Sequence, residues 1–185
     1  YRPSLAHNNH IEDNHIFKIG QGLLNDLGGI YTLGVSNGTT IQHNLIHDVQ
    51  AAANAGRGIY LDEGSSGILV DGNIVYNTSH EAFMLTYGKD NTVVNNIFAL
   101  SKNELIGAYK KADGQSLDFE RNILYWTQGR LTREPWLSTN YIDRNLLWNP
   151  NAAPAPFGED AVIADPLFIN PQTGERGSGT NSRPE

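Results

Sequence analysis

A short motif built around asparagine recurs along the chain and constrains its fold more than any other feature. In each copy an aliphatic or aromatic residue stands three positions before the asparagine, and a large apolar residue stands two positions after it. The asparagines are Asn14, Asn44, Asn73, Asn96, Asn122 and Asn145, spaced 30, 29, 23, 26 and 23 residues apart. A repeat of this length with two or three short strands per copy is typical of a solenoid in which each copy forms one coil.

In such a solenoid the strands of successive coils pair in parallel about 4.8 Å apart, and the motif's apolar residues stack in the interior. The asparagines then stack at a tight turn, where their amides can hydrogen-bond from coil to coil as in cross-β ladders. A single asparagine is an ordinary turn residue, but a column in register predicts a ladder. The predicted fold is an all-β parallel β-helix of about six coils.

The predicted coils occupy residues 1–150. Residues 151–185 are predicted to form a proline-rich loop, the segment Ala164-Asp165-Pro166-Leu167-Phe168-Ile169 and, after Gly174, a mobile tail of small and polar residues.

The composition excludes several classes of protein. The net charge of -7 argues against a surface that neutralises nucleic-acid phosphates. No run of 18 apolar residues is long enough to span a membrane. The chain has no cysteine, so disulfides and thiolate metal sites are excluded. We expect no cofactor, no bound metal, and a monomer.

A second periodic feature consists of three strand-like segments that begin near Ile30, Ile59 and Phe83. Strand alternation places these residues inside and their successors Tyr31, Tyr60 and Met84 on the outer face. The next outward positions hold Leu33, Asp62 and Thr86, with Tyr87 and Glu63 at the strand ends. An elongated face that carries aromatic rings, hydroxyls and acids suits a sugar chain, which offers apolar ring faces and many hydroxyl groups.

These segments and the motif around Asn44-Leu45-Ile46-His47-Asp48-Val49 resemble the right-handed parallel β-helix family over about residues 8–150. They look like the C-terminal part of bacterial β-helix proteins grouped with glycoside hydrolases and other polysaccharide-active enzymes. The resemblance implies a secreted or periplasmic enzyme whose substrate is a polysaccharide or oligosaccharide. It also implies a signal peptide and N-terminal coils that this chain lacks.

The candidate catalytic residues are Asp62 and Glu63, which end the middle segment, with Asp26 as partner from the preceding coil. Glycoside hydrolysis needs two carboxyl groups, roughly 5 to 9.5 Å apart, and acids on adjacent coils satisfy this more easily than sequence neighbours. The alternative is that Asp62 and Glu63 form a solvated turn before Gly64.

The candidate substrate-binding residues are Tyr31, Tyr60, Thr86, Tyr87, His47 and Arg57. Two further residues, His80 and Glu81, are expected at the rim. For His47 and Arg57 the alternatives are an exposed side chain and a surface ion pair.

Two other functions compete with hydrolysis. A polysaccharide lyase or epimerase would need a Lys, Arg, Tyr or His base and a cation for the uronate carboxylate, whereas the predicted face is acidic. A non-catalytic β-helix for adhesion or carbohydrate binding would need no catalytic pair, because a fold alone does not determine function.

Overall fold

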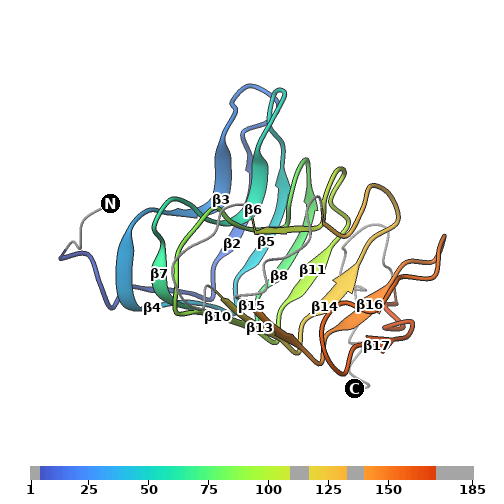
Figure 1. The fold of residues 1–185 in the computed structure, drawn as a ribbon. Coiled ribbons are helices and arrows are strands. Elements are labelled where there is room, and N and C mark those ends of the chain that lie inside the picture. Colours follow the sequence, from blue (N-terminus) through green and yellow to red (C-terminus); the bar gives the residue numbers. More distant parts are fainter. Residues whose placement is uncertain (1–4, 109–116, 133–139, 170–185) are drawn as a thin grey trace, which may run out of the picture.

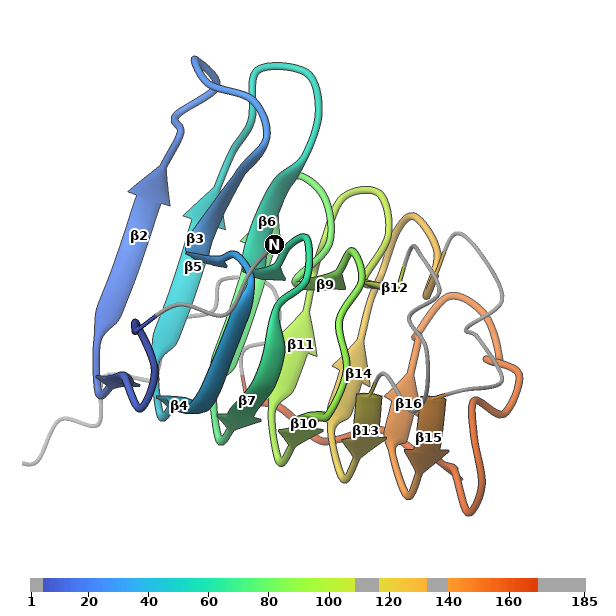
Figure 2. The same cartoon turned by 60° about the vertical axis from the view of Figure 1, so that its left-hand side comes forward.

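The computed structural model describes residues 5–108, 117–132 and 140–169, which form a solenoid of parallel strands (Figures 1 and 2). Three sheets make up its sides. Sheet A contains β1 (His10–Glu12), β4 (Val35–Gln42), β7 (Ser66–Asp71), β10 (Asn91–Val94), β13 (Leu117–Glu120) and β15 (Asn140–Asp143). Sheet B contains β2 (His15–Ile19), β5 (Leu45–Val49), β8 (Ile74–Thr78), β11 (Ile97–Ala99), β14 (Ile123–Tyr125), β16 (Leu146–Trp148) and β17 (Val162–Ile163). Sheet C contains β3 (Leu27–Thr32), β6 (Gly56–Leu61), β9 (Phe83–Leu85) and β12 (Ile106–Ala108).

The asparagine ladder joins the coils where sheet A turns into sheet B. Each side-chain amide donates to the amide oxygen of the next asparagine, over 2.9 Å at the first three steps and 3.0 and 3.1 Å at the last two. The ladder residues of the inner coils are almost completely buried, with Asn73, Asn96 and Asn145 at 0% exposure. The ladder inferred from the repeat is therefore confirmed, and the buried amides are satisfied by one another and by backbone carbonyls.

The turn itself depends on a left-handed residue just before each ladder asparagine. These residues are Asp13, His43, Gly72, Asn95, Arg121 and Arg144, with φ between 49° and 68°. A residue other than glycine pays a free-energy cost in this conformation. The hydrogen bonds made by the side-chain amide of the following asparagine offset that cost.

The interior is filled by columns of apolar side chains in strict register. Ile30 pairs with Ile59, Ile59 with Phe83, and Phe83 with Ile106. Ile59, Phe83 and Ile106 have 0% exposure. The predicted alignment of these segments is confirmed, and it fixes which side chains of sheet C point outward.

The solenoid extends beyond the predicted boundary at residue 150. Strand β17 pairs with β16 and ends sheet B, because Val162 and Ile163 repeat the parallel register of Leu146 and Leu147. Phe168 then packs its ring edge against Tyr125. The predicted mobile tail lies outside the described residues. In the described part of the chain there is no helix, and accordingly none that is long and apolar enough to cross a membrane.

The first coils are larger than the later ones because long loops connect sheet B to sheet C. The loops before β3 and β6 project together from the body of the solenoid (Figure 1). Their backbones are hydrogen-bonded, with Leu27 N donating to Ala55 O over 2.8 Å and Ala52 N donating to Leu24 O over 2.7 Å. They form a raised rim beside the outer face of sheet C.

Candidate functional site

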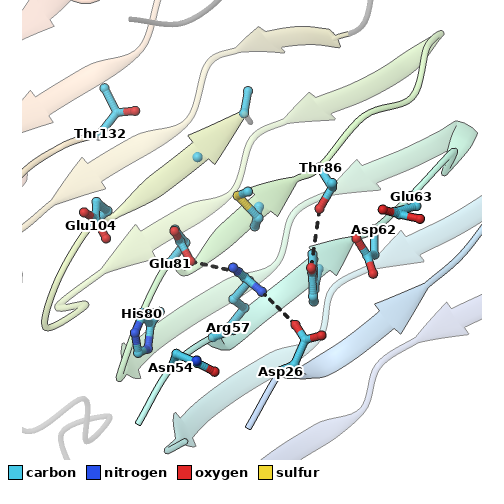
Figure 3. Close-up of a pocket in the computed structure, with 15 residues that line it drawn as sticks. Asp26, Asn54, Arg57, Asp62, Glu63, His80, Glu81, Thr86, Glu104 and Thr132 are labelled. Atoms are coloured by element: carbon cyan, nitrogen blue, oxygen red, sulfur yellow. Dashed lines mark hydrogen bonds and ion pairs between the residues drawn. The ribbon is translucent and has the colours of Figure 1, made fainter. Parts of the chain in front are cut away.

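A groove of about 690 Å³ runs over the outer face of sheet C. Its lining is strongly acidic. The charged residues are Asp26, Asp62, Glu63, Glu81, Glu104 and Arg57, with His80 beside them (Figure 3). Asp62 and Glu63 follow strand β6, whereas Asp26, Glu81 and Glu104 precede strands β3, β9 and β12. The acids therefore approach the groove from both ends of the short strands of sheet C.

Asp62 is the most enclosed carboxylate at the exit end of the strands, with 8% exposure. The hydroxyl of Tyr31, one coil away, donates a hydrogen bond to its Oδ2. Thr86, Tyr60 and the backbone of Glu63 also act to lower its pKa, and Thr86 Oγ1 donates to the Tyr60 hydroxyl over 3.4 Å. Burial acts to raise the pKa of Asp62, but these hydrogen bonds outweigh burial and hold the pKa below its usual value. Asp62 is thus an ionised group at neutral pH.

The tyrosines around Asp62 are proton donors that do not ionise at neutral pH. Burial raises the pKa of Tyr60 to about 12, against smaller lowering effects from Thr86 and Arg57. Burial, followed by the hydrogen bond to Asp62, raises the pKa of Tyr31 well above its usual value. The two rings meet edge to face with centroids 4.7 Å apart.

Glu63 occupies the second position of a tight turn after β6. Ser65 N donates to Asp62 O over 2.9 Å, and Gly64 has a φ of 77°. A positive φ at the third position is the signature of a type II turn, for which glycine is favoured. The turn brings Glu63 into the lining of the same groove as Asp62.

Arg57 is the centre of the opposite half of the groove. Its Nε donates to Glu81 Oε2 over 2.9 Å and its Nη1 to Asp26 Oδ1 over 3.3 Å (Figure 3). Its guanidinium carbon lies 4.2 Å from the centroid of the Tyr60 ring, a cation–π contact. The side chains of Arg57 and Glu81 are only 14% and 12% exposed, so Arg57 is held in place on three sides.

Asp26 lies in the same groove as Asp62, as its predicted role as partner requires. Its carboxylate, however, binds Arg57, and it is 65% exposed. Arg57 and Tyr60 lie between the two acids: Arg57 binds Asp26 and covers the Tyr60 ring, and Tyr60 contributes to the lowered pKa of Asp62. Tyr60 is also less available than predicted, since it is 5% exposed and its ring is covered by Arg57.

Not all predicted binding residues come together. Thr86 lines the groove. Tyr31 is not part of the lining, but its hydroxyl donates a hydrogen bond to the lining residue Asp62. Tyr87 is half-buried at the end of the strand and is not part of the lining. His47 lies on the outer face of sheet B, stacked on Tyr76, and does not reach the groove. The prediction that His47 lies with the sugar-binding residues is therefore wrong, because its strand β5 belongs to sheet B and not to sheet C.

The rim residues His80 and Glu81 are confirmed as lining residues, but Glu104 was not predicted. Glu104 is 5% exposed and binds Arg130 Nη2 over 2.8 Å. The signal was present in the sequence, because Glu104 precedes Ile106 as Glu81 precedes Phe83, and these two strands pair in register. The predicted alignment included the segments at Ile30, Ile59 and Phe83 but not the segment at Ile106 in the next coil.

Together, the three parallel sheets and the buried amide ladder define a parallel β-solenoid with an acidic groove on one side. The family model described as the right handed beta helix region matches residues 4–129. The chain belongs to this right-handed β-helix family. No curated protein and no solved structure gives a significant match.

Proposed function

We propose that the chain is part of a carbohydrate-active enzyme that hydrolyses glycosidic bonds in the groove over sheet C. The observation that carries the proposal is the Asp62 carboxylate, which is 8% exposed, lines the groove and accepts a hydrogen bond from the hydroxyl of Tyr31. Such an anion, fixed in an open groove, matches the nucleophile or the base of a glycoside hydrolase.

The proton donor that we assign is Glu63. Hydrolysis needs a carboxylic acid that protonates the leaving oxygen while the glycosidic C–O bond breaks. Although Glu63 is the sequence neighbour of Asp62, the turn closed by Ser65 N and Asp62 O, with Gly64 at positive φ, brings both side chains into the lining of one groove. Asp62 then either attacks the anomeric carbon or removes a proton from the attacking water.

The charge of the groove supports hydrolysis of a sugar without a carboxylate. Five lining residues are carboxylic acids and a single arginine, Arg57, is shared by two of them. A uronate would meet repulsion in such a field. Tyr60, one residue type that a lyase could use as its base, is unfavourable in that role, because its raised pKa opposes loss of its proton.

A substrate screen tests this proposal. The full chain would be incubated with neutral polysaccharides and with polyuronates, and both new reducing ends and the ultraviolet absorbance of unsaturated products would be measured. The proposal expects new reducing ends from a neutral polymer without unsaturated product. Unsaturated products from a polyuronate would instead establish a lyase, and tight binding without cleavage would establish a binding protein.

A further inference from the structure

Two histidines meet on the outer face of sheet B, and neither of them lines the acidic groove. His15 of β2 and His47 of β5 approach within 2.8 Å at their Nε2 atoms. Sheet B is the side of the solenoid that carries β2, β5 and β8 in Figure 1. The two residues are 32 positions apart in the sequence, so only the register of the coils brings them together. Neither the repeat nor the proposed hydrolysis uses them.

A carboxylate holds the far side of the His47 ring. Successive side chains of a regular strand point to opposite faces, but Asp48 has a φ of 55°, a left-handed conformation that aspartate adopts more readily than most residues. Its Oδ2 lies 2.8 Å from His47 Nδ1. Asn77 of the next coil donates a hydrogen bond to its Oδ1. The carboxylate is therefore fixed beside His47.

This contact determines where the hydrogen of the His47 ring lies. A carboxylate accepts, so Nδ1 of His47 carries the hydrogen, and Nε2 of the neutral ring has a lone pair. That lone pair accepts from Nε2 of His15, the only hydrogen available between the two atoms. A carboxylate bound to the far nitrogen of a histidine ring is the usual support of a metal-binding histidine, because it sets both the tautomer and the ring orientation.

Stacked rings fix the plane of His47. Phe17 lies 5.4 Å from it with an interplanar angle of 15°, and Tyr76 lies 4.8 Å from it with an angle of 10°. The side chain of His47 is only 14% exposed. His15 packs on the Phe17 ring at 4.5 Å but is exposed. One imidazole is thus held in place, and the other is free to adjust around a bound ion.

The distance between the two Nε2 atoms indicates which ions fit. Metal–nitrogen bonds of about 2.0–2.1 Å place two imidazole nitrogens about 2.9 Å apart at a right angle and about 3.4 Å apart at a tetrahedral angle. The observed separation of 2.8 Å is close to the right-angle value. Right-angle coordination by nitrogen is typical of Cu²⁺ and Ni²⁺, whereas Zn²⁺ prefers tetrahedral sites.

We propose that His15 and His47 are two neighbouring ligands of a divalent copper or nickel ion, which they bind through Nε2. Binding replaces the hydrogen bond between the rings. The hydrogen on Nε2 of His15 moves to Nδ1 of the same ring, so that both neutral imidazoles present a lone pair to the ion. Among the described residues no group of three or more His, Cys, Asp or Glu forms a metal site, so water completes the coordination. This proposal replaces the expectation of no bound metal and is independent of the proposed hydrolysis.

The test titrates Cu²⁺ into the full chain, prepared without a histidine tag, and follows binding by calorimetry and electron paramagnetic resonance. We expect one tightly bound ion per chain, with a spectrum that shows two coordinated imidazole nitrogens. His15→Gln removes an exposed ligand and should weaken this binding about tenfold or more. Asp48→Asn keeps a residue that tolerates the left-handed conformation but removes the charged acceptor, and it should weaken binding about tenfold.

Two further variants keep the result interpretable. His47→Phe retains an aromatic ring between Phe17 and Tyr76, so it should fold normally and lose the site. His10→Gln, on sheet A with a 66% exposed side chain, is the matched control and should bind as the wild type does. The proposal is overturned if the wild type binds no Cu²⁺, if His15→Gln and His47→Phe bind it as tightly as the wild type, or if the spectrum shows a single imidazole nitrogen. An equal loss in His10→Gln would also overturn it, because the ion would then lie on sheet A.

Discussion

Tyr31 donates its phenolic hydrogen to the carboxylate of Asp62 across two adjacent coils of the solenoid. Tyr31 belongs to β3 and Asp62 follows β6, and the two strands pair in register, with Tyr31 opposite Tyr60. The contact places a proton donor beside a buried anion and contributes to the lowered pKa of Asp62. The pKa of Asp62 therefore depends on the register between strands β3 and β6.

The first prediction concerns this hydrogen bond. Tyr31→Phe removes it and should raise the pKa of Asp62, with a loss of about 1 kcal/mol of stability at pH 7. Because the pKa of folded Asp62 is lowered, its stabilisation is fully present above the unfolded value, about pH 4, and is lost as the pH falls through the folded value. Urea unfolding from pH 7 to pH 3 should show the difference between wild type and variant shrinking as the pH falls. A difference that stays constant with pH would show that Tyr31 acts through packing alone.

The second prediction concerns the ladder. Asn73→Ala removes a fully buried amide that donates to Ile41 O over 2.8 Å and to Asn96 Oδ1 over 2.9 Å. The loss of free energy of unfolding should be about 3 kcal/mol, because buried partners are left unsatisfied. Asn14→Ala is the matched control at the exposed first rung and should cost less than about 1 kcal/mol, since water replaces its partners. Equal losses in urea unfolding would contradict the account of the ladder.

The third prediction concerns the ion pair of Arg57 and Glu81. A double-mutant cycle with Arg57→Met and Glu81→Gln should give a coupling energy of about 1–2 kcal/mol, because both groups are largely enclosed. The same cycle with Arg121→Met and Glu120→Gln serves as control. Arg121 is 45% exposed, so that coupling should stay below about 0.5 kcal/mol. A coupling for the groove pair no larger than the control would mean that water screens Arg57 as it screens a surface residue.

The fold was predictable because the residues that specify it recur in every coil. The same asparagine at each coil specifies the turn, and the same apolar positions specify the interior, so Ile30, Ile59 and Phe83 could be aligned before their pairing was known. The left-handed residue before each asparagine was not predictable from residue type alone, since Arg121 and Arg144 are not typical of that conformation. The turn imposes it on whichever side chain stands there.

The groove was predictable only in part, because side-chain directions at strand ends depend on local turns and on neighbouring coils. Alternation placed Asp62 and Tyr60 on the same face. It could not show that Arg57 reaches along the strand to cover the Tyr60 ring, which depends on the carboxylates of Asp26 and Glu81. His47 follows the ladder asparagine Asn44 by three residues, so its strand is one of those that begin after the asparagine turn. These strands form sheet B, and His47 therefore could not lie on sheet C.

The central claim is that Asp62 is the catalytic carboxylate, and substitution of this one residue tests it most directly. The measurement is kcat/KM for a neutral polysaccharide that the wild type cleaves, compared between wild type, Asp62→Asn and Asp90→Asn. Asp90 lies in an exposed turn with a φ of 57°, where asparagine is equally acceptable, so Asp90→Asn should match the wild type. We predict that Asp62→Asn folds and loses about 10³-fold in kcat/KM. A folded Asp62→Asn variant that cleaves the polymer as fast as Asp90→Asn would contradict the claim.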